Sequence, residues 1–145
     1  MNIRLMSTRQ EKDAATLLRQ KYFFDRIPIK DPYLWTFDHK DHLHFVLYEE
    51  KDIVGYAHVQ LWPDHRAAVR IVVIEEKARG RGLGRCLMAF CEKMLKDQGV
   101  QLLQAESRSD SIAFYETLGF VEMPFNDPAG VPTDPRDIAV GKRLK

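Results

Sequence analysis

The stretch Arg79-Gly80-Arg81-Gly82-Leu83-Gly84-Arg85 decides the fold because of what lies on either side of it. Before it, residues 67–74 are largely β-branched or apolar, which predicts a buried, central strand. After it, apolar residues recur at helical spacing as far as Gly99, which predicts a helix. A glycine loop between a strand and a helix can present backbone N–H groups to an anion, because glycine lacks a Cβ and the first helical turn has unpaired donors.

The charge of this loop also indicates an anionic ligand. Arg79, Arg81 and Arg85 lie at the predicted helix start, where positive side chains are mildly unfavourable against the helix dipole. A diphosphate bound to the loop would remove that conflict.

The glycine spacing excludes two common phosphate-binding motifs. A dinucleotide-binding GxGxxG that begins at Gly80 needs its third glycine at position 85, where this chain has Arg85. A Walker loop needs GxxxxGK followed by Ser or Thr, and the sequence contains no such run.

The remaining pattern, Arg79-x-x-Gly82-x-Gly84, resembles the R/Q-x-x-G-x-G/A signature of the GCN5-related N-acetyltransferase (GNAT) superfamily. The segment Ile112-Ala113-Phe114-Tyr115-Glu116-Thr117-Leu118-Gly119-Phe120 is similar to the late helix of that family, which ends in FYxxLGF. The resemblance covers roughly residues 53–120 and implies an α/β fold. The length and composition of the chain indicate a single domain over residues 1–145.

The expected architecture is a mixed, mostly antiparallel twisted sheet with a splayed central strand pair, flanked by helices. A capping box at Thr8 and Glu11 predicts the start of the first helix, and residues 23–43 are expected to be irregular or to contain a short helix. Strict alternation along the central strand would put Val69, Ile71 and Val73 on one face. Strands are expected at 2–6, 43–48, 53–62, 67–74, 100–105, 120–123 and 138–144, and further helices at 83–98 and 110–118.

The resemblance also implies acetyl-CoA as acyl donor. The exposed backbone of the splayed strand would pair with the pantetheine arm, and the loop N–H groups would hold the pyrophosphate. A backbone N–H of Val72 or Val73 would polarise the thioester carbonyl. The expected cofactor-binding residues are Ile71, Val72, Val73, Arg79, Gly80, Arg81, Gly82, Leu83, Gly84, Arg85 and Phe114.

Two side chains are candidates for proton transfer. Tyr115 maps onto the family tyrosine that protonates the leaving thiolate. The strand position that is glutamate in histone-modifying members aligns with Ala68, so His58 on the preceding strand is the candidate base, because an imidazole can take an ammonium proton directly or through water. A chain of waters and a purely structural role for His58 are the alternatives.

The predicted activity is transfer of an acetyl group to a primary amine of a small molecule or peptide, by direct attack in a ternary complex. Cys86 and Cys91 lie within the predicted helix and are not expected to be acylated. One alternative is a non-catalytic acyl-CoA-binding regulatory module, and another is an interaction domain whose loop binds a different phosphate.

Composition limits the partners. Lysine plus arginine (22) nearly balance aspartate plus glutamate (21), so no nucleic-acid partner is expected. No apolar run is long enough to span a bilayer, which favours a cytoplasmic protein without a membrane partner. The spacing of His39, His42 and His44 does not fit a structural zinc site, so no metal is expected. A monomer or a homodimer is compatible with the sequence.

Overall fold

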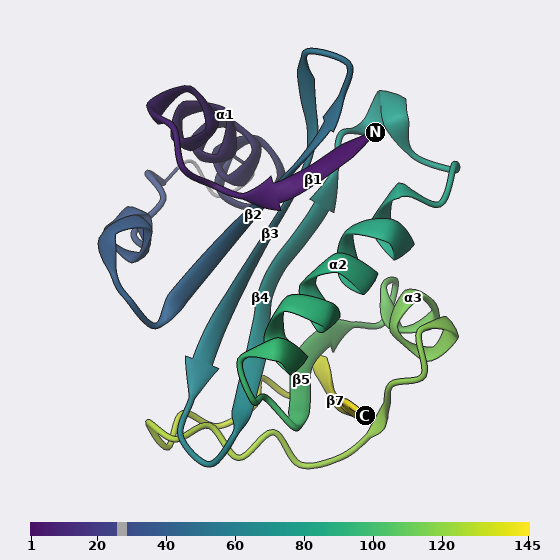
Figure 1. Cartoon of the computed structure of the whole chain (residues 1–145). Helices are drawn as coiled ribbons and strands as arrows, with labels where there is room; N and C mark the ends of the chain where they lie inside the picture. The colour runs from purple at the N-terminus through teal and green to yellow at the C-terminus, as the bar shows by residue number, and fades with distance from the viewer. Residues whose placement is uncertain (26–28) are drawn as a thin grey trace.

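Seven strands form one sheet in the computed structural model, which describes residues 1–25 and 29–145 (Figure 1). The strands are β1 (Asn2–Leu5), β2 (His42–Glu49), β3 (Asp52–Trp62), β4 (Arg66–Ile74), β5 (Leu102–Arg108), β6 (Val121–Glu122) and β7 (Asp137–Arg143). Their order across the sheet is β1-β2-β3-β4-β5-β7-β6. All neighbours are antiparallel except β4 and β5, which confirms the predicted mixed, mostly antiparallel sheet.

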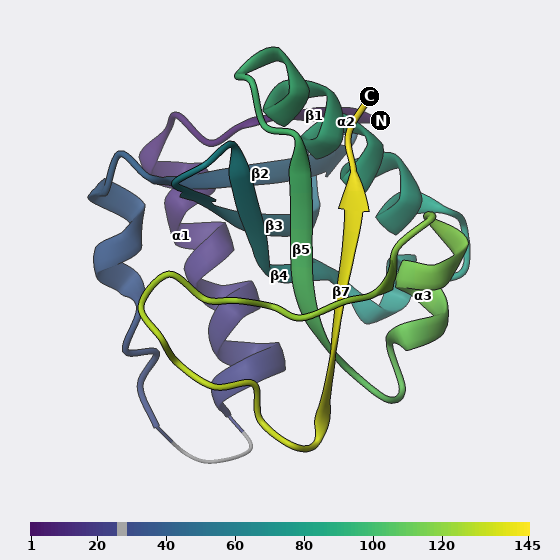
Figure 2. The same cartoon turned by 90° about the horizontal axis from the view of Figure 1, so that it is seen from below.

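Helices cover both faces of the sheet (Figures 1 and 2). On one face lies α1 (Arg9–Arg19), which continues into a π-helical turn over Gln20–Phe24. On the other face lie α2 (Leu83–Asp97) and α3 (Ile112–Thr117), above the larger hydrophobic core. Short 3-10 helices cover Leu34–Asp38 and Glu76–Ala78. The first of these lies in the segment 23–43 that was expected to be irregular or to hold a short helix, and residues 26–28 of that segment lie outside the described residues.

The predicted capping box begins α1. Thr8 Oγ1 accepts the Glu11 N–H at 3.1 Å, and Glu11 Oε1 accepts the Thr8 N–H at 3.2 Å. The buried Glu11 carboxylate also accepts hydrogen bonds from Arg4 Nε and Tyr48 Oη, both at 2.7 Å. Burial opposes ionisation, but the bonds from Tyr48, the Ser7 N–H and Arg4 outweigh it and lower the pKa of Glu11 to about 2. One carboxylate therefore joins β1, β2 and α1.

A β-bulge in β4 changes which residues share a face. His58 of β3 pairs with Ile71 and Val59 pairs with Val69, so Arg70 is an extra residue in β4. Val69 packs into the core beneath α2, whereas Ile71 and Val73 pack with α1 on the opposite face. The expectation that Val69, Ile71 and Val73 share a face is wrong, because one inserted residue moves every later side chain to the other side of the sheet.

The centre of the sheet is forked, as predicted. The strands β4 and β5 pair in parallel only from Arg66–Leu102 to Val69–Ala105. Beyond that point β4 continues to Ile74 and β5 to Arg108, and β5 stays paired with β7 on its other edge. The strand β5 therefore begins and ends later than the expected 100–105, and its last residues form one side of the fork.

Candidate active site

A cleft of about 750 Å³ lies at the fork between β4 and β5. Its wall is completed by the loop before α2, by α3 and by the turn that follows α1, which contributes Tyr22 and Phe23. The sequence-predicted residues that line it are Ile71, Val72, Val73, Arg79, Gly80, Gly82, Leu83, Gly84, Arg85, Phe114 and Tyr115. Two other candidates, Arg81 and His58, are not among the described residues that line the cleft.

The glycines of the loop serve two different purposes. Gly80 and Gly82 have φ angles of 81° and 76°, and Gly82 is the N-cap of α2, so the left-handed backbone itself requires glycine there. Gly84 is needed for space, because a Cβ at this position would lie 3.1 Å from Phe114 Cε1. The first two glycines shape the loop, and the third lets α2 approach α3.

The three arginines of the loop point to different partners. Arg79 Nε donates to the Ile74 carbonyl at 2.8 Å, at the end of β4. Arg81 donates to Glu49 of β2 through both terminal nitrogens, at 2.7 and 2.5 Å, which holds its side chain beside a separate depression. Arg85 lines the cleft and has no hydrogen bond or ion pair with any residue that the structure describes. Arg85 and the terminal nitrogens of Arg79 are therefore available to an anion in the cleft, whereas Arg81 could contribute only its backbone N–H.

Tyr115 has the environment of a proton donor. The side chain is 7% exposed and lines the cleft, with its ring held edge-on between Phe114 and Phe120 at centroid distances of 5.4 and 5.2 Å. Burial raises the pKa of the phenol to about 12, so it stays protonated at neutral pH. Within the described part of the chain the hydroxyl has no hydrogen-bond partner.

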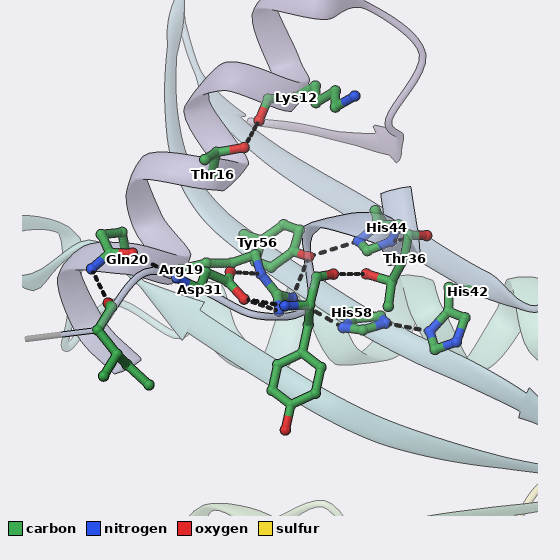
Figure 3. Close-up of polar contacts among 12 residues, drawn as sticks. Lys12, Thr16, Arg19, Gln20, Asp31, Thr36, His42, His44, Tyr56 and His58 are labelled. Atoms are coloured by element: carbon green, nitrogen blue, oxygen red, sulfur yellow. Dashed lines mark hydrogen bonds and ion pairs between the residues drawn. The ribbon is translucent and has the colours of Figure 1, made fainter. Parts of the chain in front are cut away.

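His58 lies in a buried polar network instead (Figure 3). Arg19 Nη1 lies 3.1 Å from His58 Nδ1, and His58 Nε2 lies 2.7 Å from His42 Nδ1. A guanidinium only donates, so His58 Nδ1 accepts and its Nε2 carries the proton that is donated to His42. Burial, with the nearby charges of His44 and Arg19, lowers the pKa of His58 to about 2. This position favours the structural role of His58 over that of base, because neither ring nitrogen is left to receive an ammonium proton.

The rest of the network holds the start of β2 against α1 (Figure 3). Arg19 donates to both oxygens of Asp31, at 2.5 and 3.2 Å, and to Tyr56 Oη at 3.1 Å. His44 Nε2 lies 3.1 Å from the Thr36 carbonyl, which only accepts, so His44 Nδ1 accepts the Tyr56 hydroxyl proton at 2.6 Å. Burial lowers the pKa of His44 to about 4. Both ring nitrogens of His44 and of His58, and the Tyr56 hydroxyl, are thus paired.

The histidine-rich segment does not form a metal cluster. His39 and His42 pack edge-on against the Trp35 ring, at centroid distances of 5.7 and 5.3 Å. Over residues 1–25 and 29–145, no three His, Cys, Asp or Glu side chains are grouped as metal ligands. Over the same residues, no helix is both long and apolar enough to cross a membrane.

Four charged residues that line the cleft were not among the sequence-predicted site residues: Arg70, Glu106, Arg108 and Asp110. Arg70, the bulge residue of β4, and Glu106 of β5 both line the cleft. An arginine inside an otherwise apolar strand was the available signal for Arg70. Glu106 gave no signal in the sequence, because its position depends on how far β5 runs beyond its pairing with β4.

A forked central strand pair, with a glycine loop at the N-terminus of the following helix, defines the class of acyl-CoA N-acyltransferase folds. The family model described as "Acetyltransferase (GNAT) family" matches residues 12–120. The chain therefore belongs to the GNAT family and is an N-acetyltransferase, as its sequence motifs predicted.

Known proteins similar to this chain agree with that assignment. A Bacillus subtilis (strain 168) protein that carries a provisional acetyltransferase name is 27% identical over 124 residues, which cover 83% of each chain. The ribosomal-protein-S18-alanine N-acetyltransferase from Escherichia coli has a TM-score of 0.75 and 24% identity, with 99% of this chain and 94% of that chain covered. An aminoglycoside 6'-N-acetyltransferase complexed with coenzyme A has a TM-score of 0.83 at 15% identity, with 100% and 98% covered. These structures have the same fold.

Proposed function

We propose that this protein transfers the acetyl group of acetyl-CoA to a primary amine of a small molecule or peptide, by direct attack in a ternary complex. The observation that carries the proposal is a single cleft lined by the glycine loop, the unpaired edge of β4 and Tyr115. Its volume of about 750 Å³ lies within the usual range of about 300–1,000 Å³ for small-molecule sites.

The cleft provides a separate feature for each part of the donor. Backbone N–H groups around Gly80 and Gly82, with the Arg85 side chain, suit the pyrophosphate. The backbone of Ile71, Val72 and Val73 is not paired with β5 and can bond to the amides of the pantetheine arm. The coenzyme A bound to the aminoglycoside 6'-N-acetyltransferase with this fold supports the same use of the cleft here.

The chemistry follows from these positions. The acceptor ammonium loses one proton, and its nitrogen attacks the thioester carbon while a backbone N–H of Val72 or Val73 stabilises the oxyanion. The tetrahedral intermediate then breaks its C–S bond, and the Tyr115 phenol gives its proton to the departing thiolate. The second proton on nitrogen restores the phenol, so the products are the amide, CoA thiol and one released proton.

A direct transfer fits the two cysteines better than an acyl-enzyme does. Cys91 lies on the buried face of α2, and burial raises the pKa of its thiol. Cys86 lies on α2, and it is not among the described residues that line the cleft.

Isothermal titration with acetyl-CoA and with CoA tests the donor site. Gly82→Trp should abolish saturable binding by obstructing the loop. Gly130→Trp is the matched control, because Gly130 also has a positive φ of 75° with open space around it but is not among the described cleft residues. Binding that survives Gly82→Trp, or no binding by folded wild-type protein, would overturn the donor assignment.

Replacement of Tyr115 by phenylalanine tests the proposed acid, and acetylation by wild-type protein separates an enzyme from a non-catalytic acyl-CoA-binding module. If Tyr115 is the acid, turnover should fall by about a hundredfold or more while acetyl-CoA affinity is kept. Unchanged turnover would remove Tyr115 from the mechanism, and a wild-type protein that binds acetyl-CoA but acetylates no amine would favour the binding module.

A further inference from the structure

The fork in the sheet carries opposite charges on its two arms. The strands β4 and β5 pair for the last time at Val69 and Ala105, and the next residues are Arg70 on β4 and Glu106 on β5. Both side chains line the cleft in which acetyl transfer is proposed. A ligand that itself carries both signs would match this pair of opposite charges.

Arg70 is held in place and keeps one edge of its guanidinium open. Its Nε and Nη2 donate to Gln60 Oε1 at 3.0 and 2.8 Å, and its planar group packs on the rings of Trp62 and Phe125, 5.6 and 5.7 Å from their centroids. The Asp127 carboxylate lies 3.7 Å from Nη2, which is long for an ion pair with a hydrogen bond. Nη1 has no partner among the described residues, and the side chain is 31% exposed.

Glu106 lies on the same face of the sheet as Arg70. Gln104, two residues earlier on β5, donates to the Phe125 carbonyl, next to the ring on which Arg70 packs. Strand alternation puts Glu106 on the face of Gln104. The partly exposed Glu106 carboxylate has no hydrogen bond or ion pair with any residue that the structure describes.

We propose that the acceptor is a small amine that also carries a carboxylate, the chemistry of a free α-amino acid, and that Glu106 and Arg70 bind its two ends. This inference rests on the proposed acetyl transfer. Arg70 Nη1 donates to the acceptor carboxylate, and Glu106 binds the ammonium and takes its first proton, which it later releases to water. The neutral nitrogen then attacks the thioester carbon at the fork. Glu106 fills the role of base that the buried His58 cannot serve.

In a purely structural role, Arg70 would instead hold the loop between β6 and β7 in place, since Asp127 belongs to that loop (Figure 2). Arg66 provides the matched control. It lies on the same strand, donates to the Phe125 and Asn126 carbonyls of the same loop at 3.3 and 3.0 Å, and is not among the described residues that line the cleft. If Arg70 only holds this loop in place, Arg66→Gln and Arg70→Gln should change the kinetics of acetylation in the same way.

The test is steady-state acetylation of α-amino acids and their carboxamides, paired so that only the carboxylate differs. Wild-type enzyme should show a KM for acids at least about tenfold below that for amides, the scale of one charge-assisted hydrogen bond. Arg70→Gln should raise KM for acids toward the amide value and so abolish the preference for acids, whereas Arg66→Gln should keep the preference. Equal use of acids and amides by wild-type enzyme, or the same change in both arginine variants, would overturn the proposal.

Glu106→Gln tests the other half of the proposal, in which Glu106 binds the acceptor ammonium and takes its proton. We expect kcat to fall by about a hundredfold for acids and amides alike, because both acceptors must lose an ammonium proton. The deficit should shrink as pH rises and free amine becomes abundant, which loss of a purely structural group would not produce. A deficit independent of pH, or acetyl-CoA binding with no α-amino acid acetylated, would overturn this inference. Failure to bind acetyl-CoA at all would overturn the proposed function instead.

Discussion

Glu49 and Arg81 form a two-point ion pair that joins the end of β2 to the loop before α2, with contacts of 2.5 and 2.7 Å. The two residues lie 32 positions apart in the sequence. The pair holds the Arg81 side chain at a depression lined by three acidic residues and by Lys77, outside the cleft lined by Arg85. Two arginines that look equivalent in the loop sequence are therefore not equivalent in the fold.

The first prediction compares these two arginines. Arg85→Ala should weaken acetyl-CoA binding by about tenfold, since it removes a charged donor that lines the cleft. Arg81→Ala should change Kd by less than about threefold, because an exposed ion pair contributes little and its side chain lies elsewhere. Isothermal titration at one fixed salt concentration measures both, and equal losses would contradict the assignment.

The second prediction concerns the contact between α2 and α3. Gly84→Val should lower the free energy of unfolding by about 1–3 kcal/mol, because a Cβ at residue 84 already lies 3.1 Å from Phe114 Cε1. Denaturant titration checks the value. The double variant Gly84→Val with Phe114→Leu should lose less free energy of unfolding than the sum of the two single variants. Strict additivity would show that the two side chains do not meet.

The third prediction is the pH dependence of stability that comes from Glu11. Its pKa is lowered from 4.5 to about 2 in the folded protein, so its contribution is full above pH 4.5 and is lost as pH falls toward 2. Glu11→Gln should therefore destabilise by up to about 3 kcal/mol at pH 7 and by progressively less as pH falls below 4.5. Denaturant titrations across this pH range measure the effect, and Glu122→Gln, at an exposed position, is the control. The same pH dependence of stability in both variants would contradict the prediction.

The fourth prediction is the protonation state of His58. Correlation of its ring nitrogens with carbon-bound ring protons by NMR should show a neutral ring protonated at Nε2 from pH 5 to pH 8, because Arg19 donates to Nδ1 and burial lowers the pKa to about 2. A titration near pH 6.5 would restore His58 as a candidate base.

The fifth prediction tests the buried pair of Arg19 and Asp31, both 1% exposed. Asp31→Asn should destabilise the protein by about 3–5 kcal/mol, because it leaves the Arg19 charge buried without its counter-ion. Thermal and denaturant unfolding measure this cost. The exposed pair of Arg136 and Asp134 provides the comparison, for which Asp134→Asn should change the free energy of unfolding far less than Asp31→Asn does.

Features that depend on neighbours in the chain could be predicted from the sequence. The capping box at Thr8 and Glu11 needs residues three apart, and the left-handed Gly80 and Gly82 lie within one short loop. Spacing of this kind is visible in the sequence because the backbone geometry of a turn or helix start allows few residue types. The family motifs extended that prediction to the forked sheet and the glycine-loop end of the cleft.

The sequence by itself thus determined the class of fold, the glycine loop and the position of Tyr115, whereas tertiary structure decided which side chains reach the cleft. The bulge at Arg70 depends on pairing with β3, and the environment of His58 depends on Arg19, 39 residues away. Glu106 belongs to the site only because β5 leaves β4 after Ala105. Register, burial and ion pairing between distant segments are set by how the layers pack, so residue spacing along the chain does not encode them.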